Sequence, residues 1–380
     1  MGVIIAVPGS DTRGIRPMRS VSRYAAFGLL AGLLLTACGN GESAPEIAAD
    51  TSKPSEITSE VVETAQAEGE VVVYTNSPDE LWDALIPKFE QAYPGIKISP
   101  VSLNGPELVQ RLLSEQRSGA STADLVIDSS PSTFFGLKES LAERSSVFDS
   151  ELPDYAKPWP GVYAISAEPS IIVYNKAAFG EDPPESLADV AATAGENRGK
   201  LTTYDIDSEN GYAQMWTLTK DRDDAWRLYE QLAPSTRYEM NGGSMTQKLA
   251  QGEYTAGYFQ SGLVRGLLKP SGLDSVLGWS YESDGTIVVP RYASVVKGAA
   301  HPNAAALLQD YLLSAPGQTV ACSSGLTAVR DDVATTCGDF SVKGVTDQVG
   351  EENILMVPLD EALRADKPSF AARLTEARGQ

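Results

Sequence analysis

Histidine and cysteine, which serve as bases, nucleophiles and metal ligands, are few in this chain of 380 residues, with one histidine and three cysteines. Its single histidine, His301, stands in the sequence Ala-His-Pro-Asn. One histidine excludes a two-histidine metalloprotease helix and a multi-histidine metal cage. A Ser-His-Asp triad would have to be built around His301 alone, and the chain has no nucleophile-elbow motif. A hydrolase that uses a pair of carboxylates remains an alternative, because the spacing of the 51 acidic residues along the sequence does not exclude that two of them form such a pair in the fold.

Four turns carry polar groups that could bind a small solute instead. They lie at residues 76–77, 129–130, 208–212 and 243–244, each at the start of a predicted helix. Helix starts favour anions through unpaired N–H donors and the helix dipole. Arg291, next to Pro290, could add a bidentate clamp on a phosphate or carboxylate group. The predicted ligand-binding residues are Asn76, Ser77, Ser129, Ser130, Ser208, Asn210, Gly211, Tyr212, Ser244, Tyr258 and Arg291.

Two other interpretations of these turns remain open. Each serine could be only an N-cap, which contributes about 1 kcal/mol to its own helix. An acid that faced the site would repel a polyanion and suit an ammonium group, as in a zwitterion such as an aminoalkyl phosphonate. Acids on the solvent side would only offset the helix dipoles. The acids at these turns are Asp79, Glu80, Asp128, Asp205, Asp207 and Glu209.

Alternating strands and helices must position these turns. Short apolar runs predict strands at residues 71–74, 96–101, 124–127, 170–174, 201–204, 254–259 and 285–290. Helices are predicted after Ser77, at 106–116, after Ser130, after residue 212, after Ser244 and at 303–313. Ser77 is the predicted N-cap of the first helix, and Ser244 opens a predicted capping box. The alternation predicts an α/β fold with a mostly parallel sheet, in which ligands bind beyond the carboxyl ends of the strands.

Composition limits the class of partner and the number of domains. The chain has 30 basic and 51 acidic residues, which give a formal charge of −21. This charge argues against nucleic acid or anionic lipid as a partner, because both need a basic face. The length and a hydrophobic content of 42% allow a large core and suggest two domains or two lobes.

The first residues predict an export signal that ends in a lipid anchor. Arginines at positions 13, 16, 19 and 23 precede an uncharged, mostly apolar run at 25–37 that is too short to span a bilayer. Leu35-Thr36-Ala37-Cys38 resembles a bacterial lipobox, so residues 1–37 are the predicted signal peptide and Cys38 the lipidation site. An ordinary secretory signal and a true start at Met18 are the alternatives. Residues 38–56 are polar and acidic and predict a flexible tether.

Cys322 and Cys337 are predicted to form a disulfide, because the export signal places them in an oxidising compartment. The closed loop would stabilise the fold by roughly 3 kcal/mol in the chain-entropy model. A metal site is the weaker alternative, since the two thiols lack histidine partners.

Three stretches together resemble a bacterial family-1 extracellular solute-binding protein, in the branch that includes ferric-binding proteins. They are EGEVVVY at 68–74, IIVYN at 171–175 and the helix-and-turn segment at 297–318. The resemblance implies the type II periplasmic-binding fold, in which two α/β lobes joined by crossover strands close on a solute. The implied crossings lie near 165–170 and 289–294. One lobe would hold residues 57–165 and 295–345, and the other would hold residues 166–294 and 346–380.

The resemblance implies a monomer that binds solute without catalysis or cofactor and passes it to the permease subunits of an ABC transporter. The protein would be exported and would contact the membrane only through its lipid, at the outer face of the cell membrane or in the periplasm. An extracytoplasmic sensor of the same fold, which reports the solute to a membrane partner, is a further alternative to a binding protein for import. A lipid-anchored, carboxylate-based hydrolase is the alternative from another class.

The solute is expected to be a small organic or phosphorus-containing anion or zwitterion, such as a phosphonate, a phosphate ester or a carboxylate. Ferric members of the family carry an adjacent tyrosine pair about ten residues after a Gly-Glu step. Here Gly252-Glu253 is followed at that distance by Gly262 and Leu263, so the pair is absent. Ferric iron stays as the alternative cargo. Its oxygen ligands would come from Tyr204, Tyr212, Tyr254 and Tyr258.

Overall fold

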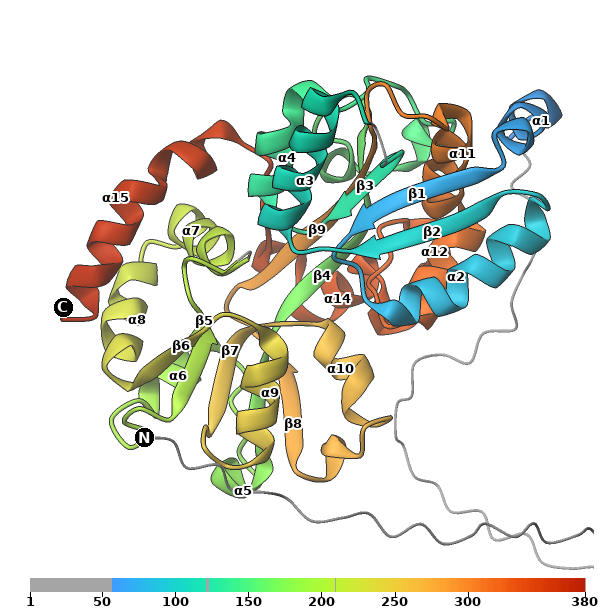
Figure 1. Cartoon of the computed structure of the whole chain (residues 1–380). Helices are drawn as coiled ribbons and strands as arrows, with labels where there is room; N and C mark the ends of the chain where they lie inside the picture. The colour runs from blue at the N-terminus through green and yellow to red at the C-terminus, as the bar shows by residue number, and fades with distance from the viewer. Residues whose placement is uncertain (1–56, 121–122, 209, 380) are drawn as a thin grey trace, which may run out of the picture. The chain divides into compact units, whose positions relative to one another are not determined.

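The structure is a computed structural model, and it describes residues 57–120, 123–208 and 210–379. The predicted signal peptide, Cys38 and the tether lie outside the described residues. The described chain has the α/β fold that the alternating pattern predicts (Figure 1). Its strands are β1 (Glu70–Thr75), β2 (Lys97–Ser102), β3 (Leu125–Asp128), β4 (Val162–Asn175), β5 (Leu201–Tyr204), β6 (Thr236–Glu239), β7 (Ala256–Ser261), β8 (Leu277–Tyr281), β9 (Thr286–Val295) and β10 (Ile354–Met356).

Helices separate most of these strands along the chain (Figure 1). In the part of the chain described they are α1 (Ser59–Glu68), α2 (Asp79–Ala92), α3 (Gly105–Ser118), α4 (Pro131–Leu137), α5 (Lys176–Phe179), α6 (Leu187–Ala192), α7 (Gly211–Asp221), α8 (Ala225–Leu232), α9 (Gly242–Ala250), α10 (Leu263–Leu268), α11 (Pro302–Leu313), α12 (Ala315–Ser323), α13 (Ala334–Cys337), α14 (Val342–Val349) and α15 (Glu361–Ala377).

The strands form a mixed sheet in the order β2-β1-β3-β9-β4-β7-β5-β6, with β10 beside β9 and β8 beside β4. In the first half of the sheet (β1, β2 and β3), β1 is parallel to both neighbours. In the second half (β5, β6, β7 and β8), β5 is parallel to β6 and β7. β4 and β9 run antiparallel to each other between the halves, whereas β10 is parallel to β9, so the sheet is mixed.

β4 joins the two halves of the sheet. Its residues 162–169 pair with β9, and its residues 170–175 pair with β7 and β8. This is the arrangement expected of two lobes joined by crossover strands. The assignment of particular residue ranges to each lobe stays a prediction.

α2 shows how well periodic apolar residues predict a helix. Leu81, Leu85 and Phe89 are fully buried, as their helical spacing predicts. The helix ends at Ala92, shortly before Gly95, whose φ of +95° suits glycine.

Two predicted helix starts are wrong. Ser77 does not cap α2, because the helix begins at Asp79, its N-cap residue is Pro78 and no side chain caps it. The Ser77 backbone N–H donates to Thr75 Oγ1 at 2.8 Å. α9 begins two residues before Ser244. Asn241 is its N-cap and accepts the Ser244 N–H at 2.8 Å, so Asn241 has the role predicted for Ser244.

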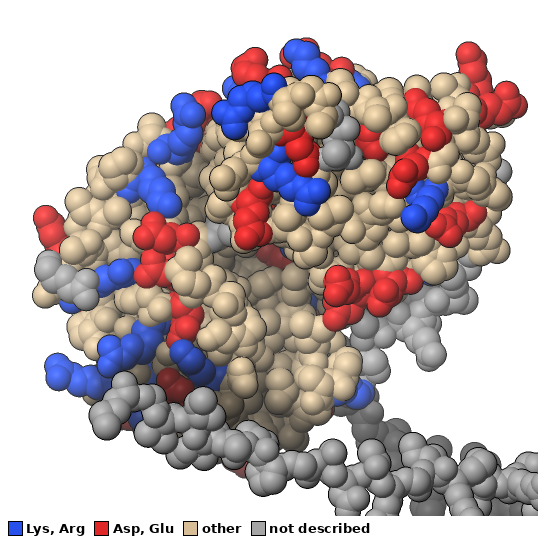
Figure 2. Space-filling model, in the orientation of Figure 1, with Lys and Arg blue, Asp and Glu red and all other residues tan. Residues whose placement is uncertain are grey.

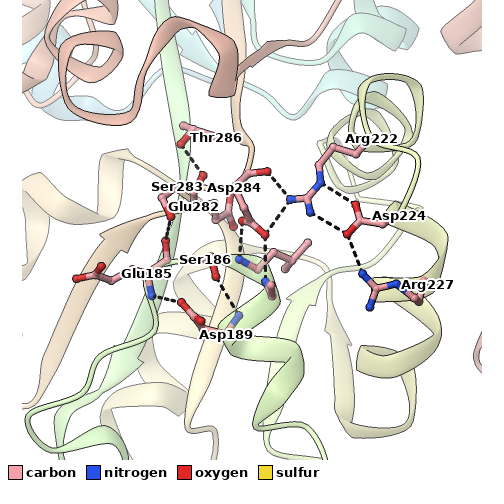
Figure 3. A network of polar contacts seen from close by, with 12 residues as sticks. Glu185, Ser186, Asp189, Arg222, Asp224, Arg227, Glu282, Ser283, Asp284 and Thr286 are labelled. Atoms are coloured by element: carbon pink, nitrogen blue, oxygen red, sulfur yellow. Dashed lines mark hydrogen bonds and ion pairs between the residues drawn. The ribbon is translucent and has the colours of Figure 1, made fainter.

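A network of polar contacts holds the turn between β8 and β9 (Figure 3). Arg222 Nη1 lies 2.8 Å from Asp284 Oδ2, and Arg222 Nε donates to Asp224 Oδ1 at 3.0 Å. Asp284 also accepts the N–H groups of Leu187 and Ala188, which satisfies donors at the start of α6. The turn therefore fixes the point from which β9 runs back into the middle of the sheet.

A buried carboxyl group lies where β4 passes from one half of the sheet to the other. Glu282 Oε1 accepts the Phe259 N–H at 2.7 Å, and Glu282 Oε2 is bonded to the Ser170 hydroxyl. Ser170 Oγ accepts the Ile287 N–H of β9 at 3.0 Å. Phe259 has a φ of +56°, an unfavourable backbone conformation for a phenylalanine. These contacts tie β4, β7 and β9 together at the junction.

The predicted disulfide between Cys322 and Cys337 is confirmed, with a Cα–Cα distance of 5.7 Å. It links α12 to α13, and both cysteines are buried. Of the helices that the structure describes, none has both the length and the apolar surface that a membrane crossing requires.

Candidate functional site

A cavity of about 710 Å³, lined mostly by residues with polar side chains, lies where strands from both halves of the sheet end. Its lining residues lie at or just after the carboxyl ends of β1, β2, β5 and β6. This edge of an α/β sheet is where ligands bind. Figure 2 shows a hollow with mainly uncharged residues in it and acidic residues along its rim. The residues that line this cleft cavity are Asn76, Ser102, Leu103, Asn104, Pro106, Tyr204, Asp207, Ser208, Asn210, Met240, Asn241 and Gly242.

A narrow pocket beside the cleft cavity is lined by the buried, positively charged side chain of Arg291. Arg291 lies on β9 and Glu168 on β4, with Arg291 Nε 3.9 Å from Glu168 Oε2. Both side chains are 5% exposed. An arginine and a glutamate on the two joining strands therefore compensate each other's charge at the base of the site.

A chain of hydrogen bonds runs from Arg291 across the site. Arg291 Nη1 donates to Asn76 Oδ1, and Asn76 Nδ2 donates to Ser129 Oγ at 3.3 Å. Asn210 Nδ2 donates to the same hydroxyl at 3.4 Å, from the other half of the sheet. Because Ser129 Oγ accepts both bonds, its O–H can donate to a solute. Asn210 Oδ1 is buried without a hydrogen-bond partner among the described residues, so it can accept one.

Tyr204 lines both the cleft cavity and the narrow pocket. Burial raises the pKa of its phenol to about 12, although a hydrogen bond to the backbone of Ser261 opposes this shift. The phenol is therefore neutral near pH 7. A Cβ atom on Gly242 would lie 2.6 Å from Tyr204 Oη, so the start of α9 can approach the ring this closely only with glycine.

Seven of the predicted ligand-binding residues line cavities, four of them away from the cleft cavity itself. Asn76, Ser208 and Asn210 line the cleft cavity, and Ser129 and Arg291 line the narrow pocket with Asn210. A separate cavity between α4, α7 and α15 is lined by Ser130, Ser208 and Tyr212.

The other predicted residues have structural contacts instead. Ser77 and Gly211 are buried, and a Cβ on Gly211 would lie 2.0 Å from the Asp205 carbonyl oxygen. Ser244 Oγ donates to Glu239 Oε2 at 3.2 Å. Tyr258 is in the core, where its hydroxyl lies 3.0 Å from Thr236 Oγ1.

The four tyrosines suggested as iron ligands do not meet at one point. Tyr212 donates to the Leu363 carbonyl at 2.6 Å, and Tyr254 donates to Glu239 Oε1 at 2.5 Å. Of the four, Tyr204 is the one that lines the cleft cavity. Across the described residues there is also no cluster of three or more His, Cys, Asp or Glu side chains that could hold a metal ion.

His301 lies at the start of α11, away from the cleft cavity. Its N–H and its Nδ1 each lie 2.9 Å from a carboxylate oxygen of Asp124, which also accepts the Val72 N–H. The contact joins α11 to the strands of the first half of the sheet, which is a structural role.

Some residues of the site were missed from the sequence. Asn104 and Asn241 cap α3 and α9 and also line the cleft cavity. The signal for both is an asparagine before a Gly-Pro or Gly-Gly helix start, which resembles the serine turns that were recognised. Glu168 gives no such signal, because it is a single acid within the apolar strand β4.

The acids at the turns have different surroundings. Asp128 is fully buried and accepts the Ser130 N–H at 2.6 Å, next to the start of α4. Asp207 lines the cleft cavity and lies 3.6 Å from Lys367 Nζ, with most of its side chain exposed. Among the described acids at these turns, Asp207 therefore places a carboxylate at the cleft cavity.

Several solved structures of binding proteins from bacteria have a similar fold. A substrate binding protein of an ABC transporter from Agrobacterium tumefaciens is 22% identical, with a TM-score of 0.71 over 81% of this chain and 94% of that chain. Ferric iron-binding protein A of Mannheimia haemolytica, in an open conformation, is 15% identical, with a TM-score of 0.64 over 82% and 98%. FutA of Trichodesmium, in complex with iron and citrate, is 19% identical, with a TM-score of 0.63 over 80% and 99%.

These likenesses show the two-lobe binding-protein fold, and no curated protein matches the sequence. The profile of a protein family, described as bacterial extracellular solute-binding protein, matches residues 74–319. This match covers more than half of the chain. The chain therefore belongs to the family of bacterial extracellular solute-binding proteins.

Proposed function

We propose that this protein is the receptor of an ABC importer and binds a small organic or phosphorus-containing zwitterion or anion between the two halves of its sheet. Family membership and the likeness to a substrate binding protein of an ABC transporter support the transport role. In this proposal Cys38 carries the lipid that holds the chain at the membrane, as the lipobox-like sequence indicates. The permease subunits take the solute from the closed protein.

The observation that carries the choice of solute is the chain of contacts from Arg291 to Asn210. The guanidinium group and the Ser129 O–H are donors for a phosphonate, phosphate or carboxylate group. Glu168 compensates the charge of Arg291, so the site suits a singly charged head group better than a polyanion.

The acceptors on the other side of the site favour a zwitterion. Asn210 Oδ1 has no partner among the described residues, and Asp207 places a carboxylate at the cleft cavity. Both can accept hydrogen bonds from an ammonium group. An aminoalkyl phosphonate or an amino acid has both groups that this arrangement would recognise.

Ferric iron is the cargo that several structures of similar fold suggest. The arrangement of phenols disfavours iron, because iron(III) prefers several oxygen anions and Tyr204 is the one tyrosine among the described residues that lines the cleft cavity. The high pKa of Tyr204 also disfavours the phenolate form near pH 7.

A thermal-shift screen of the purified protein tests the proposal. The panel contains aminoalkyl phosphonates, phosphate esters, carboxylates, amino acids and ferric salts. A solute at about a hundred times its Kd stabilises the native state by about 2.7 kcal/mol, which raises the melting temperature. We expect a phosphonate, phosphate ester, carboxylate or amino acid to do so. Stabilisation by ferric salts alone would replace this proposal with iron transport.

A further inference from the structure

An apolar groove continues the cleft cavity along the second half of the sheet. It has a volume of about 920 Å³ and lies between α9 and α10. Tyr204 and Gly242 line both the groove and the cleft cavity, so the two hollows are continuous. Its apolar walls come mainly from Ala250, Leu263, Val264, Leu267, Leu268 and Leu273.

Two of the exposed large apolar side chains line these hollows. Among the described residues Met240 and Leu267 are the most exposed large apolar side chains, at 59% and 48%. Met240 lines the cleft cavity and Leu267 lines the groove. A single exposed leucine needs no explanation, but two such side chains in one continuous hollow indicate a binding surface.

The lining of the groove limits what can occupy it. Glu80, which comes from α2 on the far side, is the charged residue in its wall. Leu263, at the start of α10, packs against a buried cluster of Leu81 of α2 with Ala321 and Leu326, so this cluster closes one side of the groove. A concave apolar surface that is bounded on one side and opens into the polar site suits a segment of the solute itself.

We propose that the groove binds the apolar part of the solute whose polar head lies near Arg291. The solute class is then an organic anion or zwitterion with an alkyl or aryl substituent of several carbons. This inference rests on the proposed function, because it needs a solute in the cleft cavity. It adds that affinity comes from hydrocarbon contact as well as from the polar head.

The experiment is a calorimetric titration of the purified protein with three homologous series. These are straight-chain carboxylates from acetate to octanoate, the matching alkylphosphonates, and the matching primary alcohols. Burial of each methylene contributes enough to tighten binding by about fourfold. We expect Kd to fall stepwise with chain length in at least one series, whatever its head group.

Leu267→Ser is the variant that tests the groove, and its exposed position keeps the fold intact. Val147→Ser is the matched control, because Val147 is 46% exposed and lies outside both the groove and the cleft cavity. We expect Leu267→Ser to weaken the longest members about fivefold or more and to leave the shortest unchanged. Val147→Ser should change neither.

Three results would overturn the inference. The first is an affinity that does not change with chain length, or no binding in any series. The second is an equal effect of the two variants. The third is a Leu267→Ser variant that binds every chain length normally but fails to support uptake in cells, which would assign the groove to a protein partner. If short polar solutes still stabilise the protein in the thermal-shift screen, the proposed function survives each of these results.

Discussion

At the scale of single residues, the site depends on Arg291 and Glu168, which face each other from the two joining strands. A buried pair of this kind adds little net stability, but removal of one partner leaves an uncompensated charge. Glu168 also lies near the backbone N–H of Thr327. The pair therefore presents one guanidinium group to the narrow pocket while the pocket as a whole stays close to neutral.

Arg291→Ala should weaken an anionic or zwitterionic solute by about ten- to a hundredfold, the effect of one charge-assisted hydrogen bond. Ser77→Ala should change affinity less than twofold, because Ser77 lines neither the cleft cavity nor the narrow pocket. Titration calorimetry measures both. A double variant, Arg291→Ala with Glu168→Gln, removes the unpaired carboxylate and controls for misfolding. Equal, negligible effects of the two single variants would remove Arg291 from the site.

Glu282 makes the stability of the fold depend on pH. Burial raises the pKa of its carboxyl group from 4.5 to about 8, although its hydrogen bonds to Ser170 and Phe259 oppose this shift. The folded state holds the proton more tightly than the unfolded state does. The stability that protonated Glu282 contributes is therefore complete below about pH 4.5 and is lost as the pH rises through about 8.

Glu282→Gln should reduce this pH dependence, because the amide keeps the shape and the hydrogen bonds of the protonated acid. Urea unfolding of both proteins between about pH 5 and pH 8 measures the difference, which we expect to be on the order of a few kcal/mol. Parallel curves for the two proteins would show that Glu282 does not titrate in this range.

At the scale of the elements, apolar patterns in the sequence predict much of the fold. The buried side chains of α2 recur at helical spacing, and β1, β2, β3 and β5 follow short apolar runs. The first part of β4 was missed because Glu168 and Pro169 interrupt its apolar pattern. In the structure the carboxylate faces Arg291, so a buried charge is paired across two strands that are distant in sequence.

The site could be predicted only in part, because the sequence shows which residues lie at a turn but not where they point. Asn76 reaches the cleft cavity, whereas the next residue, Ser77, is buried. Asn241 reaches it, whereas Ser244 is one helical turn further on and contacts Glu239. Tyr258 lies on β7, whose residues 256–260 are buried, so its position as a core residue depends on the helices packed around it.

The start of α9 should accept an added methyl group at Gly243 but not at Gly242. Gly243→Ala should be neutral or stabilising by up to about 1 kcal/mol, since the nearest atom to its Cβ would be Asn241 Oδ1 at 3.7 Å. Gly242→Ala should displace Tyr204, whose hydroxyl would lie 2.6 Å from the new Cβ. We expect Gly242→Ala to melt at a lower temperature than Gly243→Ala and to bind solute more weakly. Identical melting and binding would show that α9 does not fix Tyr204.

At the scale of the whole described chain, the proposed binding groups come from both halves of the sheet. Asn76 and Ser129 follow β1 and β3, whereas Asn210 precedes α7 in the second half. Arg291 lies on β9, one of the two strands that join the halves. A solute that contacts all four would favour the arrangement in which the halves lie close together, so binding and closure are coupled.

Small-angle X-ray scattering tests this coupling most directly. The protein is measured alone and with a saturating amount of the solute that gives the largest stabilisation in the thermal-shift screen. We predict a smaller radius of gyration with solute, and no such change for Arg291→Ala at the same solute concentration. An unchanged radius of gyration for the wild-type protein at proven saturation would contradict capture of the solute between two closing halves.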